Sequence, residues 1–185
     1  KPDAYFDFDL FKKHVALAQR IMDDIIDLEL EKIERIMAKI DSDPENEDVK
    51  HTESVLWQKI YKKSGQGRRT GVGITAEGDM LAALGLRYGT EEATEFAEKV
   101  HQTVALSAYR SSVEMAKERG AFEVYDSERE KNNPFINRLR EADPELYEEM
   151  KKYGRRNIAC LTIAPTGTTS LMTQTTSGIE PVFLP

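Results

Sequence analysis

Residues 157–170 have the sequence NIACLTIAPTGTTS, in which a short apolar run is followed directly by a turn rich in hydroxyl groups. The β-branched residues within 157–163 predict a short buried strand. Pro165 and Gly167 then indicate a turn, and the apolar residues after it are suited to the start of a helix. The fold class is therefore decided here, because this is the one segment whose pattern clearly changes from helical to extended.

The turn after this strand has the groups needed to hold an anion. The start of a helix leaves backbone N–H groups unpaired at the positive end of the helix dipole. Gly167 lets an anion approach the backbone closely, and the hydroxyls of Thr166, Thr168 and Thr169 add donors. These features predict a phosphate cradle that needs no lysine, and the lysine-containing element of a P-loop is absent. The alternative is a turn whose hydroxyls cap their own backbone.

Most of the chain before this strand has helical periodicity. Residues 9–40 show the strongest pattern, with apolar residues at three- and four-residue steps and Asp9 as the expected N-cap. That apolar pattern is wide, so we expect much of the helix to be buried. Residues 179–184 at the end of the chain predict a second strand. We therefore expect a mostly α-helical chain with two or three short strands near its C-terminus.

Two other segments invite a functional interpretation that their spacing does not support. Residues 41–54 are crowded with acidic side chains and predict a solvated, mobile loop. The glycine and terminal glutamate of a calcium loop are missing there, so we predict no metal site. Residues 71–78 partly match a dinucleotide-binding fingerprint, but the third glycine comes two places too late. Tight turns or close packing explain these glycines better.

Composition narrows the functional class. The chain has 185 residues, of which 32% are charged, and its net charge is −7. An acidic chain argues against general nucleic-acid binding, which favours a basic stripe. No apolar run is long enough to predict a membrane span, and no secretory signal is visible, so we expect a cytoplasmic protein. Cys160 is the only cysteine, and no histidine lies near it in sequence, so we predict a buried structural thiol.

Residues 157–170, together with Ser177-Gly178-Ile179-Glu180-Pro181, resemble the large catalytic chain of ribonucleotide reductases. Three upstream motifs resemble the same family in the same order: residues 68–73, 79–85 and 116–122. The resemblance spans most of the chain, and its C-terminal motif is the most specific part.

The resemblance implies an enzyme that reduces the ribose 2′-hydroxyl of ribonucleotides by thiyl-radical chemistry, inside a ten-stranded α/β barrel. It also implies that Thr166, Gly167, Thr168 and Thr169 bind the substrate phosphates. A loop with glycine at 167 and no glutamate is most similar to the adenosylcobalamin-dependent class II, with the cofactor bound largely outside this segment. A thiol reductant such as thioredoxin and a homodimeric parent are further implications. Diphosphate and triphosphate substrates both stay open.

The departures from the family are equally informative. The N-x-C-x-E pattern of the radical cysteine does not occur, so Cys160 does not inherit that role and we predict no catalytic residue. The redox cysteines would lie before Lys1 and after Pro185 in the family order. We therefore expect residues 1–185 to be an internal segment of the catalytic barrel, inactive alone, with 157–185 forming a strand, a phosphate loop and a strand. The alternative is a stand-alone helical binding module with an anion-binding threonine-rich loop.

Overall fold

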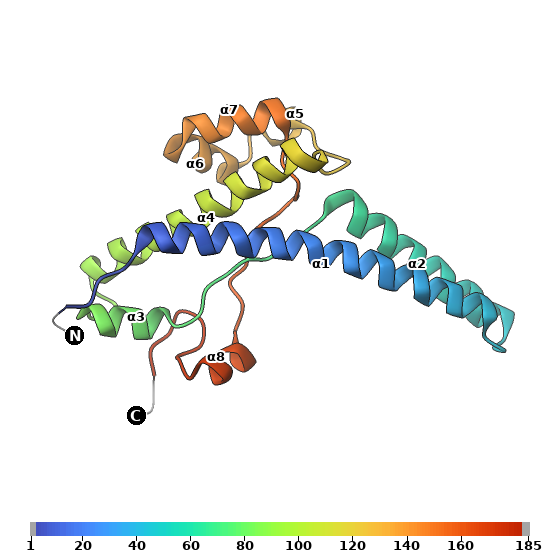
Figure 1. Ribbon diagram of the computed structural model, residues 1–185, viewed down its shortest axis with the longest axis horizontal. Helices are drawn as coiled ribbons and strands as arrows, with labels where there is room; N and C mark the ends of the chain where they lie inside the picture. The colour runs from blue at the N-terminus through green and yellow to red at the C-terminus, as the bar shows by residue number, and fades with distance from the viewer. Residues whose placement is uncertain (1–2, 183–185) are drawn as a thin grey trace.

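A computed structural model describes residues 3–182 as eight helices joined by turns and extended segments (Figure 1). The helices are α1 (Phe8–Ser42), α2 (Glu47–Gly67), α3 (Glu77–Leu84), α4 (Glu91–Arg119), α5 (Ser127–Glu130), α6 (Pro134–Ala142), α7 (Pro144–Tyr153) and α8 (Gly167–Thr173). The long helix α1 packs against both α2 and α4, and α7 packs against α4 and α6. Within the described residues, none of these helices has the length and apolar content of a membrane span.

Helix α1 is less buried than its apolar pattern predicted. It begins after Asp7, whose carboxylate accepts a hydrogen bond from the Leu10 N–H at 2.9 Å, so the N-cap lies two residues before the predicted Asp9. Leu17 and Leu28 are 56% and 61% exposed. The prediction of a widely buried helix was wrong because α2 and α4 leave one side of α1 uncovered.

The acidic segment 41–54 is mostly helical, so the prediction of a loop over its whole length was wrong. Helix α1 continues through Ser42 and α2 begins at Glu47, which leaves only residues 43–46 between them. Asn46 caps α2 by accepting a hydrogen bond from the Asp48 N–H at 2.8 Å. Glu47 and Asp48 then lie at the positive end of the helix dipole, where acidic side chains stabilise a helix. Part of the negative charge that suggested a solvated loop therefore supports a helix start.

The predicted strands were also wrong, because residues 3–182 contain no strand and no sheet. Residues 157–163 are extended, but they form only an isolated parallel bridge between Val72 and Leu161. In this bridge the Val72 N–H donates to the Cys160 carbonyl at 2.7 Å, and the Thr162 N–H donates to the Val72 carbonyl at 3.0 Å. Two extended segments without further neighbours do not make a stable parallel ladder. The predicted strand 179–184 has no regular structure at residues 179–182, and residues 183–185 lie outside the described part of the chain.

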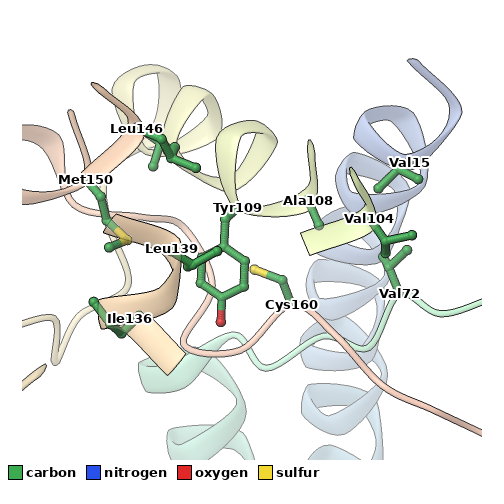
Figure 2. Packing of buried hydrophobic residues seen from close by; sticks show 11 residues of the cluster. Val15, Val72, Val104, Ala108, Tyr109, Ile136, Leu139, Leu146, Met150 and Cys160 are labelled. Carbon is green, nitrogen blue, oxygen red and sulfur yellow. The ribbon is translucent and has the colours of Figure 1, made fainter. Parts of the chain in front are cut away.

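The two extended segments are residues 70–74 and residues 157–163. The hydrophobic core lies where they pass beneath α4, α6 and α7 (Figure 2). Val104, Ala108 and Tyr109 of α4 meet Val72 and Cys160 there. Cys160 is fully buried, and burial raises the pKa of its thiol to about 12. The prediction of a buried structural thiol is confirmed.

Candidate functional site

The threonine loop, which we define as residues 166–178, lies at the far end of the extended segment that leaves the core (Figure 1). It contains the short helix α8, whose N-cap is Thr166. Thr166 has a φ of +52°, in the left-handed region that a threonine rarely adopts. Its hydroxyl oxygen accepts a hydrogen bond from the Gly178 N–H at 2.8 Å and lies 3.1 Å from the Thr75 hydroxyl oxygen. These contacts hold both ends of the loop together and stabilise the unusual conformation.

The first turn of α8 provides backbone donors without acceptors. The first hydrogen bond of the helix joins the Ser170 N–H to the Thr166 carbonyl at 2.8 Å. Within residues 3–182, the N–H groups of Gly167, Thr168 and Thr169 have no protein acceptor. All three residues are exposed, and a Cβ built on Gly167 would meet no atom within 4 Å. Three adjacent donors therefore face space that an anion could occupy.

A cavity of about 220 Å³ adjoins this turn. It is lined mostly by small and polar residues: Gly71, Gly73, Ile74, Thr75, Thr162, Ala164, Thr166 and Thr169. Gly73 is explained by close packing, because a Cβ there would lie 2.6 Å from the Thr162 carbonyl oxygen. This contact confirms the packing interpretation of the glycines in 71–78.

The start of helix α3 forms hydrogen bonds with the C-terminal end of the threonine loop. The N–H groups of Ala76 and Glu77 donate to the carbonyls of Thr176 and Gly178 at 3.1 and 3.4 Å. The Asp79 carboxylate accepts from the Thr176 N–H at 2.8 Å, and the Asp79 N–H donates to the Thr176 hydroxyl at 3.3 Å. The start of α3 thereby fixes the segment that returns from α8.

A second polar region was not predicted from the sequence. The Asp23 cluster, which we define as Gln19, Asp23, Arg68, Ser112 and Asn157, is buried between α1, α4 and the extended segments. The Asn157 side-chain amide donates to the Asp23 carboxylate at 2.8 Å, and the Arg68 Nε donates to the same oxygen at 2.7 Å. Gln19 donates to the Asn157 amide oxygen at 2.9 Å, and Ser112 donates to it at 2.8 Å.

The charged groups of the Asp23 cluster are paired with one another. Burial favours the neutral acid of Asp23, but hydrogen bonds and charge from Arg68, with help from Asn157, outweigh it and lower the pKa of the carboxyl. Asp24 and Asp27 lie close enough to Asp23 to form an acidic group, yet Arg119 pairs with Asp24 at 2.8 Å and Arg68 pairs with Asp27 at 2.7 Å. This region is therefore best described as a scaffold. One sequence signal could have found it, because Gln19 and Asp23 continue the four-residue step of the buried Val15.

Arg155 anchors the start of the same extended segment. Its side chain is almost completely buried, and its guanidinium lies 5.4–5.6 Å from the ring centroids of Tyr109, Phe122 and Tyr125. It pairs with Glu130 at 2.5 Å and donates to the Asn157 carbonyl at 3.0 Å. Polar contacts thus hold both ends of the extended segment. Those at its start, made by Arg155 and the Asp23 cluster, are buried. Those at its end, in the threonine loop, lie beside the backbone N–H groups that have no acceptor.

Comparison with known proteins places these features in a family. A family model described as "Ribonucleotide reductase, barrel domain" matches residues 1–185. The vitamin B12-dependent ribonucleoside-diphosphate reductase of Thermoplasma acidophilum is 31% identical over 178 residues, which cover 96% of this chain and 18% of that protein. A reductase of the same name from Mycobacterium tuberculosis is 35% identical over 117 residues, covering 63% and 14%. The ribonucleoside-diphosphate reductase subunit alpha of Chlamydia pneumoniae is 26% identical over 196 residues, covering 96% and 16%. The chain spans less than a fifth of the length of these relatives.

Proposed function

The chain belongs to the ribonucleotide reductase barrel-domain family, and from this premise we propose that it forms the substrate phosphate-binding part of a longer reductase. The longer enzyme would reduce ribonucleotides to 2′-deoxyribonucleotides by thiyl-radical chemistry. In this proposal Thr166, Gly167, Thr168 and Thr169 form the phosphate loop, and residues 1–185 form an internal segment of the catalytic barrel. Family membership favours this assignment over a stand-alone binding module.

One observation carries the assignment of the phosphate loop. The N–H groups of Gly167, Thr168 and Thr169 are adjacent, exposed and without acceptors in the described part of the chain. Phosphate oxygens accept such bonds, and the dipole of the helix start favours their negative charge. The approach to Gly167 is open, because no atom lies within 4 Å of the position of a Cβ. The loop would fix the phosphates and so set where the ribose lies, while the chemistry takes place on other parts of the enzyme.

We further propose that the longer enzyme uses adenosylcobalamin, since two of the matched relatives are named vitamin B12-dependent reductases. When bound, this cofactor would supply the initiating radical. The threonine loop does not fit it, because a corrin ring with its side chains is much larger than the adjoining cavity of about 220 Å³. The residues that hold the cofactor therefore lie elsewhere in the proposed enzyme.

The burial of Cys160 also suggests that the radical chemistry takes place on other parts of the longer enzyme. Its thiol is fully buried with a pKa of about 12, so it is neither accessible nor prone to ionise. The radical cysteine and the cysteines that receive electrons from a thiol reductant such as thioredoxin would lie in other segments. We propose a cytoplasmic enzyme and a homodimer for the longer protein.

The phosphate assignment can be tested with a charge placed in the first turn of α8. In the full-length enzyme, Thr168→Glu should fold normally, because a carboxylate suits a helix start, yet it should repel the substrate phosphates. We expect the dissociation constant for a ribonucleoside diphosphate or triphosphate to rise by about tenfold or more. Leu171→Glu is the matched control, because Leu171 is 80% exposed on the same short helix. Unchanged nucleotide affinity in Thr168→Glu would overturn the proposal.

A further inference from the structure

A directed chain of hydrogen bonds connects Thr75 to both ends of the threonine loop. The Gly178 N–H donates to the Thr166 hydroxyl oxygen at 2.8 Å, and the Thr75 hydroxyl donates to the Thr176 carbonyl at 3.1 Å. The hydroxyl oxygens of Thr166 and Thr75 lie 3.1 Å apart. Each threonine hydroxyl has one proton. Because Thr75 uses its proton for Thr176, the proton between the two hydroxyls must come from Thr166.

This proton count changes the role of Thr166. Its hydroxyl accepts from Gly178 and donates to Thr75, so it has no proton left to donate to a phosphate. The side chain instead holds residue 166 in its left-handed conformation, which sets the direction in which α8 begins. The free donors of the first turn of α8 are then its three backbone N–H groups and the hydroxyls of Thr168 and Thr169.

Asp79 provides a second, independent connection from α3 to the loop. Its carboxylate and its N–H make a reciprocal pair of hydrogen bonds with Thr176, at 2.8 and 3.3 Å. Thr176 is buried whereas Asp79 is exposed, so these bonds are only partly shielded from water. The neighbouring Gly78 lies directly against the chain that follows the loop, since a Cβ there would be 2.6 Å from the Cα of Pro181. The start of α3 therefore packs closely against the loop and the residues that follow it, so a shift of α3 would also move the loop.

We propose that Thr75 and Asp79 are positioning residues that hold the threonine loop in its phosphate-binding shape. This inference rests on the proposed function of the loop. We assign neither side chain a direct contact with the substrate, because the one hydroxyl proton of Thr75 is donated to Thr176 and the Asp79 carboxylate accepts from the Thr176 N–H. Thr75 acts through Thr166 and Thr176, whereas Asp79 acts through Thr176 alone. Loss of either connection should loosen the loop and weaken substrate binding without altering the reacting groups.

The test uses steady-state kinetics of the full-length enzyme, with loss and rescue at each position. Thr75→Val removes both hydroxyl contacts at nearly constant volume, whereas Thr75→Ser keeps the hydroxyl. We expect Thr75→Val to raise the KM for the ribonucleotide roughly five- to tenfold, because the two lost contacts act on binding only through the position of the loop, with kcat changed less than twofold. Thr75→Ser should restore the KM to within about twofold of the wild type. Thr103→Val is the matched control, because the Thr103 hydroxyl also donates to a backbone carbonyl, at 2.8 Å, but lies on α4.

Asp79 supplies the second pair of variants. Asp79→Leu removes the acceptor for the Thr176 N–H and should also raise KM, whereas Asp79→Asn keeps an oxygen there and should bind closer to the wild type. Thermal unfolding of each variant identifies any that fail to fold, in which case the pair of variants at the other position decides the result. A KM for Thr75→Val within twofold of the wild type, or a Thr75→Ser variant as impaired as Thr75→Val, would overturn the positioning role.

The two proposals fail in different ways. If Thr168→Glu weakens nucleotide binding but Thr75→Val and Asp79→Leu do not, the phosphate loop stands and its positioning by α3 is wrong. If Thr168→Glu also binds like the wild type, the phosphate assignment itself is wrong. Raised KM in the loss variants with rescue by Thr75→Ser and Asp79→Asn supports both.

Discussion

The Asp23 cluster and the threonine loop lie toward opposite ends of one extended segment and are both polar, yet their donors and acceptors are used in opposite ways. In the cluster, both amide protons of Asn157 are donated, one to Asp23 at 2.8 Å and one to the Arg68 carbonyl at 3.1 Å. In the loop, the backbone donors of residues 167–169 have no protein acceptor within residues 3–182.

This difference separates the scaffold from the proposed site better than residue type does. Buried polar groups must be paired, and among residues 3–182 the only buried side-chain nitrogen or oxygen without a partner is Oδ1 of Asn137, which is in neither region. Donors exposed in a turn carry no such penalty, since water satisfies them until a ligand replaces it. A closed polar cluster therefore costs stability when one member is removed, whereas an open one costs binding.

Among substitutions that test this comparison, we expect the largest effect on stability at Asp23. Asp23→Ala would leave Arg68, whose side chain is only 6% exposed, without its buried partner, and Arg156 would lose a contact at 3.2 Å. We expect the free energy of unfolding to fall by about 3–5 kcal/mol, as for other broken buried pairs. Urea unfolding measures this. Asp24→Ala is the control, because its partner Arg119 is partly exposed, and it should cost less than about 1 kcal/mol.

Sequence reasoning identified the family and the extended segment because both depend on local residue order. The apolar run of 157–163 is extended, and Cys160 is buried as predicted. The predicted strand was wrong because a strand depends on pairing with neighbouring strands, and residues 70–74 provide only one bridge. Local composition cannot show how many partners a segment has.

The missed cluster has a similar explanation. Gln19 and Asp23 are polar, so a search for apolar steps along α1 passes over them, although both are fully buried. Their burial depends on Asn157 and Arg68, which are far away in sequence. For the threonine loop, the sequence located the residues but could not show that the Thr166 hydroxyl is already used by Thr75 and Gly178.

A matched pair of single-hydroxyl removals gives a smaller and sharper comparison. Ser112 is fully buried, and its oxygen accepts from the Asn157 N–H at 3.0 Å, so Ser112→Ala should destabilise the protein by about 1–3 kcal/mol. Thr168 is exposed and its hydroxyl has no protein partner in the described chain, so Thr168→Ala should change stability by about 0.5 kcal/mol or less. Urea unfolding of both variants checks this. Equal losses of stability would show that the two regions are not different in kind.

Acid provides the mildest way to separate the two regions, because residues 166–178 contain no titratable side chain whereas the cluster contains Asp23. Arg68 and Asn157 hold the pKa of Asp23 below its ordinary value of about 3.9, although burial acts in the opposite direction. The native carboxyl therefore binds fewer protons than the unfolded one near that pH. Its contribution to stability is complete well above pH 3.9 and is lost as the pH falls through that value toward the folded pKa.

For one such group the loss cannot exceed about 1.4 kcal/mol per pH unit. Urea unfolding at pH 5 and at pH 3 should show this loss in the wild type and a smaller loss in Asp23→Asn, which has no proton to bind there. Asp24→Asn provides the control for removing an exposed carboxylate from the adjacent position, and it should keep the wild-type dependence. If Asp23→Asn loses as much stability as the wild type between these pH values, Asp23 is not the source of the pH dependence. The contrast between a cluster of paired charges and the uncharged threonine loop would then not hold.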